Sequence, residues 1–275
     1  MGRAKEIIVK VIPSKIANEF VKKHHYSGKV VPNSTLHFGC FLDDKLHGVM
    51  SYGSPMVKAK VIHYVENTKW NEVVELNRMA FDDYLPKYSE SRCIAISIKL
   101  IKKNAPHIKW ILSFSDGNLC GDGTIYRATG FELIGVNKNT STYQMPNGEV
   151  VCSLTSSAHR TKESNGKSGT SWIKDNGGKK LNGFQIRYIY LIDKTCKITV
   201  PILSFSEIDK QGAGMYKGKK ITLAERQIIS DSSITANAAA FQVAEEGQHH
   251  PIAQNIQNDI QKRRNTKRSN TICKR

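Results

Sequence analysis

The stretch IKWILSFSDG, residues 108–117, decides how the fold of this chain is interpreted. It opens with a nearly continuous apolar run, which is typical of a central strand that is covered on both faces. Ser115 and Asp116 then emerge at the carboxyl end of that strand. Ligands in open α/β sheets collect outside the carboxyl ends of the strands, so the stretch predicts a functional site at this point.

A short helix is expected next, in the sequence GTIYRATGF of residues 123–131. Gly130 occupies the position after a helix that favours a left-handed backbone, and another strand follows it. The start of the helix offers free N–H groups to an anion or a polarised carbonyl. Tyr126 lies inside the helix, where its phenol can point back at Ser115 and Asp116. In the alternative interpretation Tyr126 only packs and Asp116 only caps the helix.

The residues before this stretch predict an alternation of strands and helices. Strands are expected at residues 6–12, 35–42, 46–52 and 72–81, and helices at residues 13–24 and 89–103. The segment Asp43-Asp44-Lys45 has the composition of a tight hairpin turn between two of the strands. The chain therefore predicts the order β-α-β-β-β-α-β-α-β up to about residue 136.

This order, with a helix tyrosine followed by Gly-Phe, resembles the N-acetyltransferase fold of the GNAT superfamily. The resemblance implies an α/β (α+β) fold with a mixed, splayed central sheet and helices on both faces. It also implies that Tyr126 protonates a leaving group.

One segment departs from that superfamily. Where acetyltransferases carry a glycine-rich loop for the pyrophosphate of coenzyme A, this chain has DYLPKYSESR, residues 83–92, without glycine. Such a loop approaches a phosphate less closely, which argues against coenzyme A. Ser89, Ser91 and Arg92 at the next helix start remain as a looser anion site. The donor is left open between acetyl-coenzyme A, an aminoacyl ester and other donors.

A closer likeness is to the Mom DNA-modification proteins of bacteriophages. It is strongest from about residue 20 to residue 136 and extends more weakly to about residue 220. The matching blocks are HHYSG at 24–28, FG at 38–39, GSP at 53–55, ELNRM at 75–79, SD at 115–116 and GTIY at 123–126. The resemblance implies attachment of a carbamoylmethyl group to N6 of adenine in double-stranded DNA, which blocks host restriction enzymes.

The implied chemistry needs a base, because the lone pair of the exocyclic nitrogen of adenine is delocalised into the ring. Asp116 is the candidate for that base, with Ser115 beside it. Tyr126 is the candidate acid for the departing group, or an orienting donor. A pocket of this fold cannot surround N6 inside a stacked duplex, so we expect the target base to be flipped.

Arg78, His25 and Tyr26 complete the candidate site. Arg78 can bind a phosphate or a carbonyl oxygen in a bidentate manner. Glu75 and Arg78 are three positions apart, which places them on opposite faces of a regular strand. His25 and Tyr26 line the pocket from the other side, although a histidine in such a position is also compatible with a purely structural role.

A metal requirement is left open by the sequence. Iron is associated with the resembling family, and His25 is a possible ligand. His24, His37 and His47 show no ligand spacing that would single out a site.

The charge of the chain favours a polyanionic partner. It contains 41 Lys+Arg against 24 Asp+Glu, a formal net charge of +17. Neutralising DNA phosphates releases counterions and gives affinity that is independent of sequence. Seven of the positive charges lie in residues 262–275, where no acidic residue occurs.

Four parts of the chain are expected. Residues 1–155 form the catalytic domain, residues 156–183 a flexible basic loop, residues 184–227 an extension that packs on the domain, and residues 228–275 a disordered tail. The strand at residues 185–192, with a second at 198–203, is expected as a final hairpin or edge pair. Candidate DNA contacts of the basic loop are Lys162, Lys167, Trp172, Lys179 and Lys180, although Trp172 can also plug a hydrophobic edge.

The six cysteines are scattered, as in proteins of a reduced compartment. No signal peptide or run of 18 apolar residues is visible. The sequence therefore predicts a cytoplasmic protein without a membrane partner, in the host cytoplasm if a phage encodes it, and leaves the oligomeric state open.

Two other functions are compatible with these features. An acyltransferase acting on a protein or small-molecule amine needs the same Tyr126 and binds acetyl-coenzyme A. A non-catalytic basic DNA-binding protein that kept the fold needs neither Asp116 nor Tyr126.

Overall fold

The computed structural model describes residues 3–117, 121–153, 169–181 and 183–213, together with the backbone of residues 215–216 and 219–220. The chain divides into two compact units, Met1–Leu223 and Ala224–Arg275, and the structure described below belongs to the first. The tail expected at residues 228–275 lies outside the described residues.

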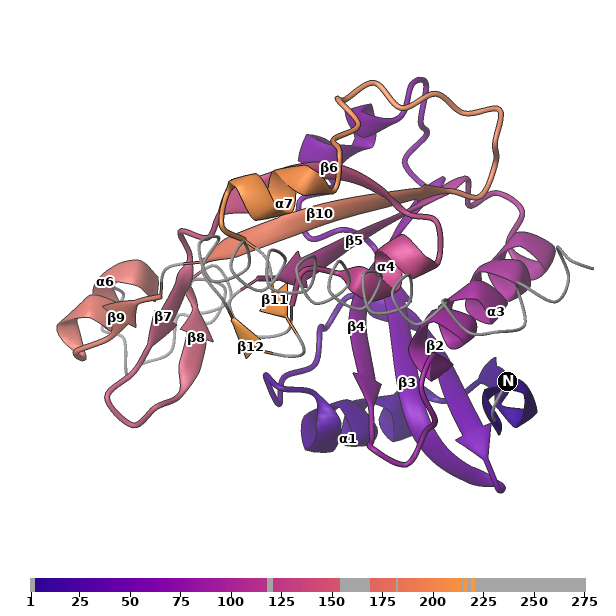
Figure 1. Ribbon diagram of the computed structural model, residues 1–275, viewed down its shortest axis with the longest axis horizontal. Helices are drawn as coiled ribbons and strands as arrows, with labels where there is room; N and C mark the ends of the chain where they lie inside the picture. The colour runs from indigo at the N-terminus through magenta and orange to yellow at the C-terminus, as the bar shows by residue number, and fades with distance from the viewer. Residues whose placement is uncertain are drawn as a thin grey trace, which may run out of the picture. The chain divides into compact units, whose positions relative to one another are not determined.

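A seven-stranded mixed sheet organises the first unit, in the order β1-β2-β3-β4-β5-β10-β6 (Figure 1). Its strands are β1 Ile8–Val11, β2 Ser34–Leu42, β3 Lys45–Gly53, β4 Val73–Phe81, β5 Trp110–Asp116, β10 Phe184–Leu191 and β6 Glu132–Lys138. The β4 and β5 strands are parallel, and every other neighbouring pair is antiparallel.

Helices connect these strands as the sequence predicts. The described helices are η1 Arg3–Glu6, α1 Ser14–His24, α2 Lys58–Val61, η2 Ile62–Tyr64, α3 Ser89–Asn104, α4 Thr124–Ala128, α6 Gly169–Asp175 and α7 Ser206–Lys210. All the strands and helices expected up to residue 136 are present, and the structure adds η1 before β1 and α2 and η2 between β3 and β4. The mixed α/β class with helices on both faces is confirmed.

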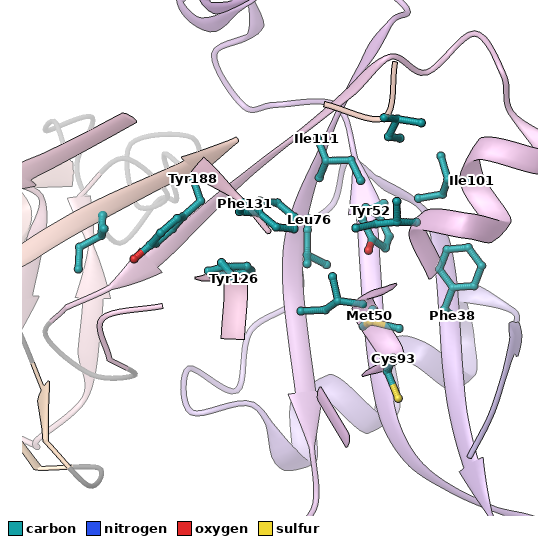
Figure 2. Packing of buried hydrophobic residues seen from close by; sticks show 14 of the residues in the cluster. Phe38, Met50, Tyr52, Leu76, Cys93, Ile101, Ile111, Tyr126, Phe131 and Tyr188 are labelled. Atoms are coloured by element: carbon teal, nitrogen blue, oxygen red, sulfur yellow. The ribbon is translucent and has the colours of Figure 1, made fainter. Parts of the chain in front are cut away.

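Alternation along β3 divides the core between the two faces of the sheet. Met50 belongs to the cluster that includes Ile94 of α3, whereas the preceding residue, Val49, packs with Ala17 and Val21 of α1. Figure 2 shows part of the first cluster, around Met50. Successive side chains of a strand point to opposite faces, so α3 and α1 cover different faces.

The β2–β3 hairpin confirms the turn expected from composition. Asp43 and Asp44 both have a positive φ, of 50° and 59°. Two adjacent residues in that conformation form the turn whose twist matches an antiparallel strand pair, and Asp tolerates it better than most residues.

The position of β10 corrects one expectation. This strand is not part of a terminal hairpin or an edge pair, because it lies between β5 and β6 and pairs antiparallel with both (Figure 1). Residues 198–203 do not form a strand; they contribute isolated bridges from Ile198 to Val65 and from Leu203 to Leu133. The apolar and aromatic residues of β10 require burial on both faces, which an edge would not provide.

A second, three-stranded sheet is formed by β8 Val150–Cys152, β7 Thr142–Gln144 and β9 Lys179–Lys180. Ile173 of α6 is completely buried against Tyr143 and Val151 of this sheet. The described part of the segment expected as a loop at residues 156–183 therefore contains a helix and a strand. The segment shows no apolar periodicity, but the burial of Ile173 packs the short helix against the sheet.

Two further features concern the environment of the protein. Among the described residues, Cys40 and Cys93 are buried, Cys152 and Cys196 are partly exposed, and none of these four forms a disulfide. None of the helices in the described ranges is long and apolar enough to cross a membrane.

Candidate active site

The candidate site begins where the two parallel strands stop pairing. The register of β4 and β5 runs from Val73 opposite Trp110 to Leu76 opposite Ser113. At this last pair the Ser113 hydroxyl donates a hydrogen bond to the Leu76 carbonyl at 3.1 Å. Beyond it, both strands continue without a shared ladder, so their main-chain groups are available to a ligand.

A β-bulge at Asn77 changes which side chains face this point. Ser51 of β3 pairs with Arg78, but the next residue, Tyr52, pairs with Leu76, so Asn77 is the extra residue. The expectation that Glu75 and Arg78 lie on opposite faces is therefore wrong. The additional residue brings both side chains to the α1 face of the sheet.

Glu75 is a largely buried carboxyl group at the end of the paired region. The backbone N–H of Met56 lies on its side of the sheet and favours the ionised form of the carboxyl group. Burial raises the pKa of Glu75 to about 7, while the Met56 contact and the charge of Arg78 act in the opposite direction. A carboxyl group with this pKa exchanges protons readily at neutral pH.

Arg78 connects the strand to the loop after α1. Its Nε donates to the Lys29 carbonyl at 2.8 Å, and an Nη donates to the carbonyl of its own preceding residue at 2.8 Å. Burial lowers the pKa of Arg78, and the acidic groups of Tyr26, Glu75 and Cys152 oppose that shift. The guanidinium remains a cation and is held in one place by main-chain acceptors.

His25 and Tyr26 stand beside this guanidinium, with ring centroids 4.2 Å apart. The backbone N–H of Ser27 donates to His25 Nδ1 at 3.1 Å. Burial, aided by the charge of Arg78, lowers the pKa of His25 to about 4. The imidazole is therefore neutral at physiological pH and carries its proton on Nε2, the nitrogen available to a ligand.

Asp116 shares the face of Glu75, whereas Ser115 does not. Glu75 is level with Leu112 in the parallel pairing, and alternation from Leu112 places Asp116 on that same face. Ser115 is buried on the opposite face, and its hydroxyl donates to the Gly121 carbonyl at 2.5 Å.

Asp122 forms hydrogen bonds at the start of α4, next to the N-cap residue Gly123. Asp122 accepts hydrogen bonds from the backbone N–H and the hydroxyl of Thr124, at 3.1 and 2.7 Å. Gly123 has a φ of 79°, and a Cβ there would lie only 2.4 Å from the ring of Tyr188. This close approach brings the helix against β10.

Tyr126 lies on the α3 face, within the core cluster shown in Figure 2. Its ring centroid is 5.4 Å from that of Phe131 and 5.2 Å from that of Tyr188. The structure therefore places Tyr126 on the face of Ser115, while Asp116 belongs to the other face.

The start of α3 holds the residues expected as a loose anion site. The Ser89 and Ser91 hydroxyls donate to backbone carbonyls of the preceding turn, at 2.5 and 3.2 Å. Arg92 donates to the Lys5 carbonyl at 3.2 Å. Tyr88 precedes the helix with a φ of 71°, a conformation that glycine would adopt more easily. These side chains serve the helix end, so they do not form a ready pyrophosphate cradle.

The described residues do not assemble an iron site. No three His, Cys, Asp or Glu side chains among them come close enough to hold a metal ion. The His37 and His47 Nδ1 atoms are engaged by Ser51 and Asp82, each at 2.8 Å. The described donor set does not fit the metal.

The basic loop candidates are only partly described. Lys162 and Lys167 lie outside the described residues. Lys179 and Lys180 are exposed on β9, and Trp172 packs against the cluster of Tyr143, Val151 and Ile173.

Two residues of the site were not identified as functional from the sequence. Glu75 is a single acid in an apolar strand, a pattern that signals a buried carboxyl group. Arg187 interrupts the apolar residues of β10 in the same way, and its guanidinium carbon lies 5.0 Å from the ring centroid of Tyr64 and 5.8 Å from that of Phe114. Its buried Nε has no hydrogen-bond partner among the described residues. Arg187 is level with Phe114, so it lies on the face of Asp116.

Comparison with known proteins identifies relatives of this chain. The Mom protein family model matches residues 6–207. The chain is 34% identical over 140 residues to the methylcarbamoylase Mom of Escherichia phage Mu. This alignment covers 50% of the chain and only 57% of the phage Mu protein.

Solved acetyltransferases show a weaker similarity. An IAA acetyltransferase from Bacillus cereus matches with a TM-score of 0.41 and 10% identity, over 67% of this chain and 99% of that one. A GNAT family acetyltransferase from Elizabethkingia anophelis with acetyl-CoA bound matches with a TM-score of 0.40 and 11% identity, over 67% and 97%. The match over residues 6–207 spans most of the sequence, and the chain belongs to the Mom protein family.

Proposed function

We propose that this protein attaches a carbamoylmethyl group to N6 of adenine in double-stranded DNA and so protects the DNA from restriction. The observation that carries the proposal is the pair formed by Glu75 and Arg78, turned to one face where β4 and β5 stop pairing. The name of the phage Mu relative, a methylcarbamoylase, supports the same reaction class.

The face that Glu75 and Asp116 share suits the adenine. N6 must lose a proton as its bond to the donor carbon forms, and either carboxylate can accept that proton. Burial raises the pKa of Glu75 to about 7, which suits a base that works near neutral pH. Asp116 stays the alternative base, or the acceptor that holds the amino group.

Three side chains on or beside that face can position the reactants. The guanidinium groups of Arg78 and Arg187 can hold a carbonyl or phosphate oxygen. The neutral His25 can donate a hydrogen bond through Nε2. Each of these roles requires a group that keeps its protonation state during the reaction.

The opposite face suits the leaving group of the donor. Tyr126 and Ser115 are found there, next to α4. A donor that passes between the diverging strands would present its reactive carbon to the carboxylates and its leaving group to the Tyr126 phenol. Acetyl-coenzyme A has no nitrogen in its acyl group and cannot supply a carbamoylmethyl group, so it fits only the acyltransferase alternative. An aminoacyl ester, or another donor that contains nitrogen, stays open for the proposed reaction.

The test is nucleoside mass spectrometry of DNA from cells that express the full chain, compared with cells that express Glu75→Gln. The proposal expects a deoxyadenosine whose mass is increased by one carbamoylmethyl group, at a level that falls in the variant. Unmodified DNA together with acetylation of an amine would support the acyltransferase alternative. Unmodified DNA together with tight DNA binding would support the non-catalytic alternative.

A further inference from the structure

Two adjoining loops leave large apolar side chains in solvent. Met56 and Val57, between β3 and α2, are 62% and 48% exposed, and Trp70, before β4, is 61% exposed. The Lys58 ammonium lies 5.0 Å from the centre of the Trp70 ring and so joins the two loops. Exposed apolar residues that gather in this way commonly mark an interaction surface. Met56, Val57 and Trp70 with Lys58, Lys60 and Lys69 are called the Trp70 surface below.

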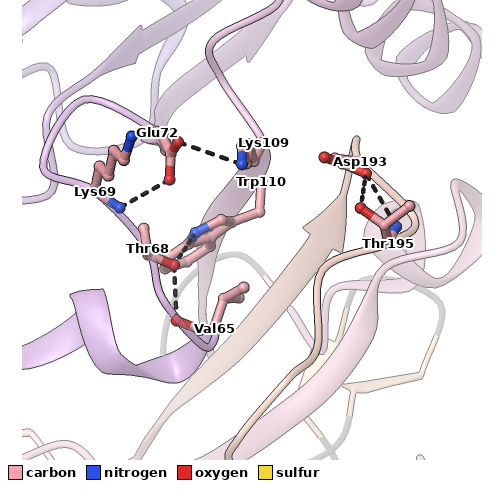
Figure 3. A network of polar contacts seen from close by, with 8 residues as sticks. All are labelled: Val65, Thr68, Lys69, Glu72, Lys109, Trp110, Asp193 and Thr195. Carbon is pink, nitrogen blue, oxygen red and sulfur yellow. Dashed lines mark hydrogen bonds and ion pairs between the residues drawn. The ribbon is translucent and has the colours of Figure 1, made fainter.

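The loop that carries Trp70 is held rigidly on its amino-terminal side. The Thr68 hydroxyl donates to the Val65 carbonyl at 2.7 Å and accepts a hydrogen bond from the indole nitrogen of Trp110 at 3.1 Å (Figure 3). Trp110 is itself completely buried. Trp70 therefore projects from a loop that is tied to the core.

The same loop is held on its carboxyl-terminal side by Glu72. One carboxylate oxygen accepts a hydrogen bond from the Lys69 backbone N–H at 2.8 Å, and the other forms an ion pair with Lys109 at 3.3 Å (Figure 3). These contacts lower the pKa of Glu72, chiefly through the Lys69 N–H, so the carboxylate is ionised at neutral pH. The loop is fixed on both sides of Trp70, yet the Trp70 ring remains exposed to solvent.

The second loop connects the Trp70 surface to the candidate site. Its backbone is fixed by the Asn33 side chain, which donates to the Ser54 carbonyl, and by Gly53, where a Cβ would lie 2.1 Å from the Asn33 carbonyl oxygen. The backbone N–H of the next exposed residue, Met56, acts to lower the pKa of Glu75, so the two groups are close. Gly53, in the same loop, is also paired with Glu75 in the β3–β4 register. The loop with the exposed apolar residues is therefore next to the candidate base.

The charge of the Trp70 surface indicates the kind of partner that it binds. Lys58, Lys60 and Lys69 stand against one exposed acid, Glu66, in residues 54–71. Lys58 is buried beneath Trp70, and burial lowers its pKa. Lysines around an exposed aromatic ring fit a polyanion whose units also offer flat rings to stack on.

We propose that the Trp70 surface is a rigid wedge that contacts duplex DNA and opens the base stack beside the target adenine. The inference rests on the proposed function, which supplies the duplex. Apolar side chains that insert between base steps unstack them, and an adenine must leave the stack before its N6 can reach Glu75. A wedge has to be rigid, which accounts for the bracing on both sides of Trp70.

The first test measures the position of Trp70 in the complex. The full chain is mixed with a 30-base-pair duplex of mixed sequence, and acrylamide quenching of tryptophan fluorescence is compared with that of Trp70→Phe. The wild type should lose the quenchable Trp70 signal when DNA binds, because stacking shields the ring. Unchanged quenching of Trp70 at saturating DNA would overturn the proposal.

The second test measures affinity and modification. Trp70→Ala should weaken duplex binding about tenfold, since loss of one base–aromatic stack commonly costs that much or more. Ile202→Ser, which changes a 55% exposed residue outside these loops, is the matched control and should keep full affinity. Changing Lys60 and Lys69 to Gln should make the slope of log affinity against log salt shallower by up to about 0.9 per lost phosphate contact.

The outcomes also separate this inference from the proposed function. If the wild type binds DNA with Trp70 shielded but no modified adenine forms, the proposed reaction is rejected and the wedge is supported. If Trp70→Ala keeps full DNA affinity and full modification, the wedge fails and the proposed reaction stands. Thermal melting of each variant confirms that it is folded before its affinity is compared.

Discussion

Glu75 and Arg78 lie on the same face of β4 although three positions separate them along the strand. The bulge at Asn77 supplies the extra residue that puts Arg78 on the face of Glu75. A buried carboxyl group whose pKa is about 7 thereby stands near a fixed cation. The backbone irregularity, and not the residue types alone, puts a carboxyl group that can accept a proton on the same face as a fixed cation.

Changing Glu75 to Gln tests that role. We expect the modification rate to fall by about two orders of magnitude or more, the scale that loss of a general base commonly produces. In the wild type the rate should rise with pH through about pH 7, as Glu75 ionises, and then level off. Glu132→Gln, at an exposed position of β6, is the control. A Glu75→Gln protein with near-normal activity would exclude Glu75 as the base.

The same substitution has an effect on stability that depends on pH. Glu75 has a folded pKa above its unfolded value, so its stabilising contribution is complete below about pH 4.5 and is lost as pH rises through about 7. The wild type loses this contribution between about pH 4.5 and 7, whereas Glu75→Gln does not. Over this interval the free energy of unfolding of the variant should therefore rise relative to that of the wild type, by at most about 3 kcal/mol. Denaturant titrations at pH 5 and pH 8 measure the difference. If the variant and the wild type differ by the same free energy of unfolding at both pH values, the pKa of the Glu75 carboxyl group is not raised.

Asp116→Asn tests the other carboxylate on the same face. If Asp116 handles the amino group, modification should fall by about two orders of magnitude while folding and DNA retention stay unchanged. The comparison with Glu75→Gln is informative, because only the residue that acts as the base should control the rise in rate near pH 7. Near-full modification by Asp116→Asn would remove this residue from the mechanism.

Tyr126→Phe tests the hydroxyl separately from the ring. The ring packs against Phe131 and Tyr188, and phenylalanine preserves that packing. A stable variant with little activity, measured by nucleoside mass spectrometry, would assign the proton-donating role to the phenol. Normal activity would leave Tyr126 with a packing role.

Deletion of residues 261–275 tests the basic end of the chain. It removes seven positive charges that have no acidic neighbours in the sequence. If they contact phosphates, the slope of log affinity against log salt should become shallower by up to about 0.9 per contact. Phosphate contacts position a protein without reading sequence, so the same adenines should be modified, more slowly at physiological salt. An unchanged slope would show that this segment makes no phosphate contact.

Local patterns in the sequence predicted most of the elements. The apolar run of β5, the hairpin at Asp43 and Asp44, and the glycine after α4 each carry a signal that depends only on neighbouring residues. The face on which Arg78 lies could not be predicted in this way, because a bulge is a property of the register between two strands. Glu75 carries a local signal, as an acid in an apolar strand, but its raised pKa depends on the burial that the neighbouring elements provide.

The partners of β10 illustrate a second limit. Its composition predicted a strand, but an alternating pattern does not say which strands lie beside it. The two sides of the candidate site show a third limit. Ser115 and Asp116 are adjacent in sequence, yet alternation separates them to opposite faces of the sheet.

The insertion of β10 between β5 and β6 has a consequence for how the chain is made. During synthesis β5 and β6 emerge early, but the strand that joins them emerges some fifty residues later. Until then each has an unpaired edge, which is a template for aggregation. Pairing across such a separation in sequence also slows folding, because the loop must close before its contacts form. A transcript truncated before residue 184 would therefore yield an aggregation-prone product, so production of active protein depends on translation beyond Leu191.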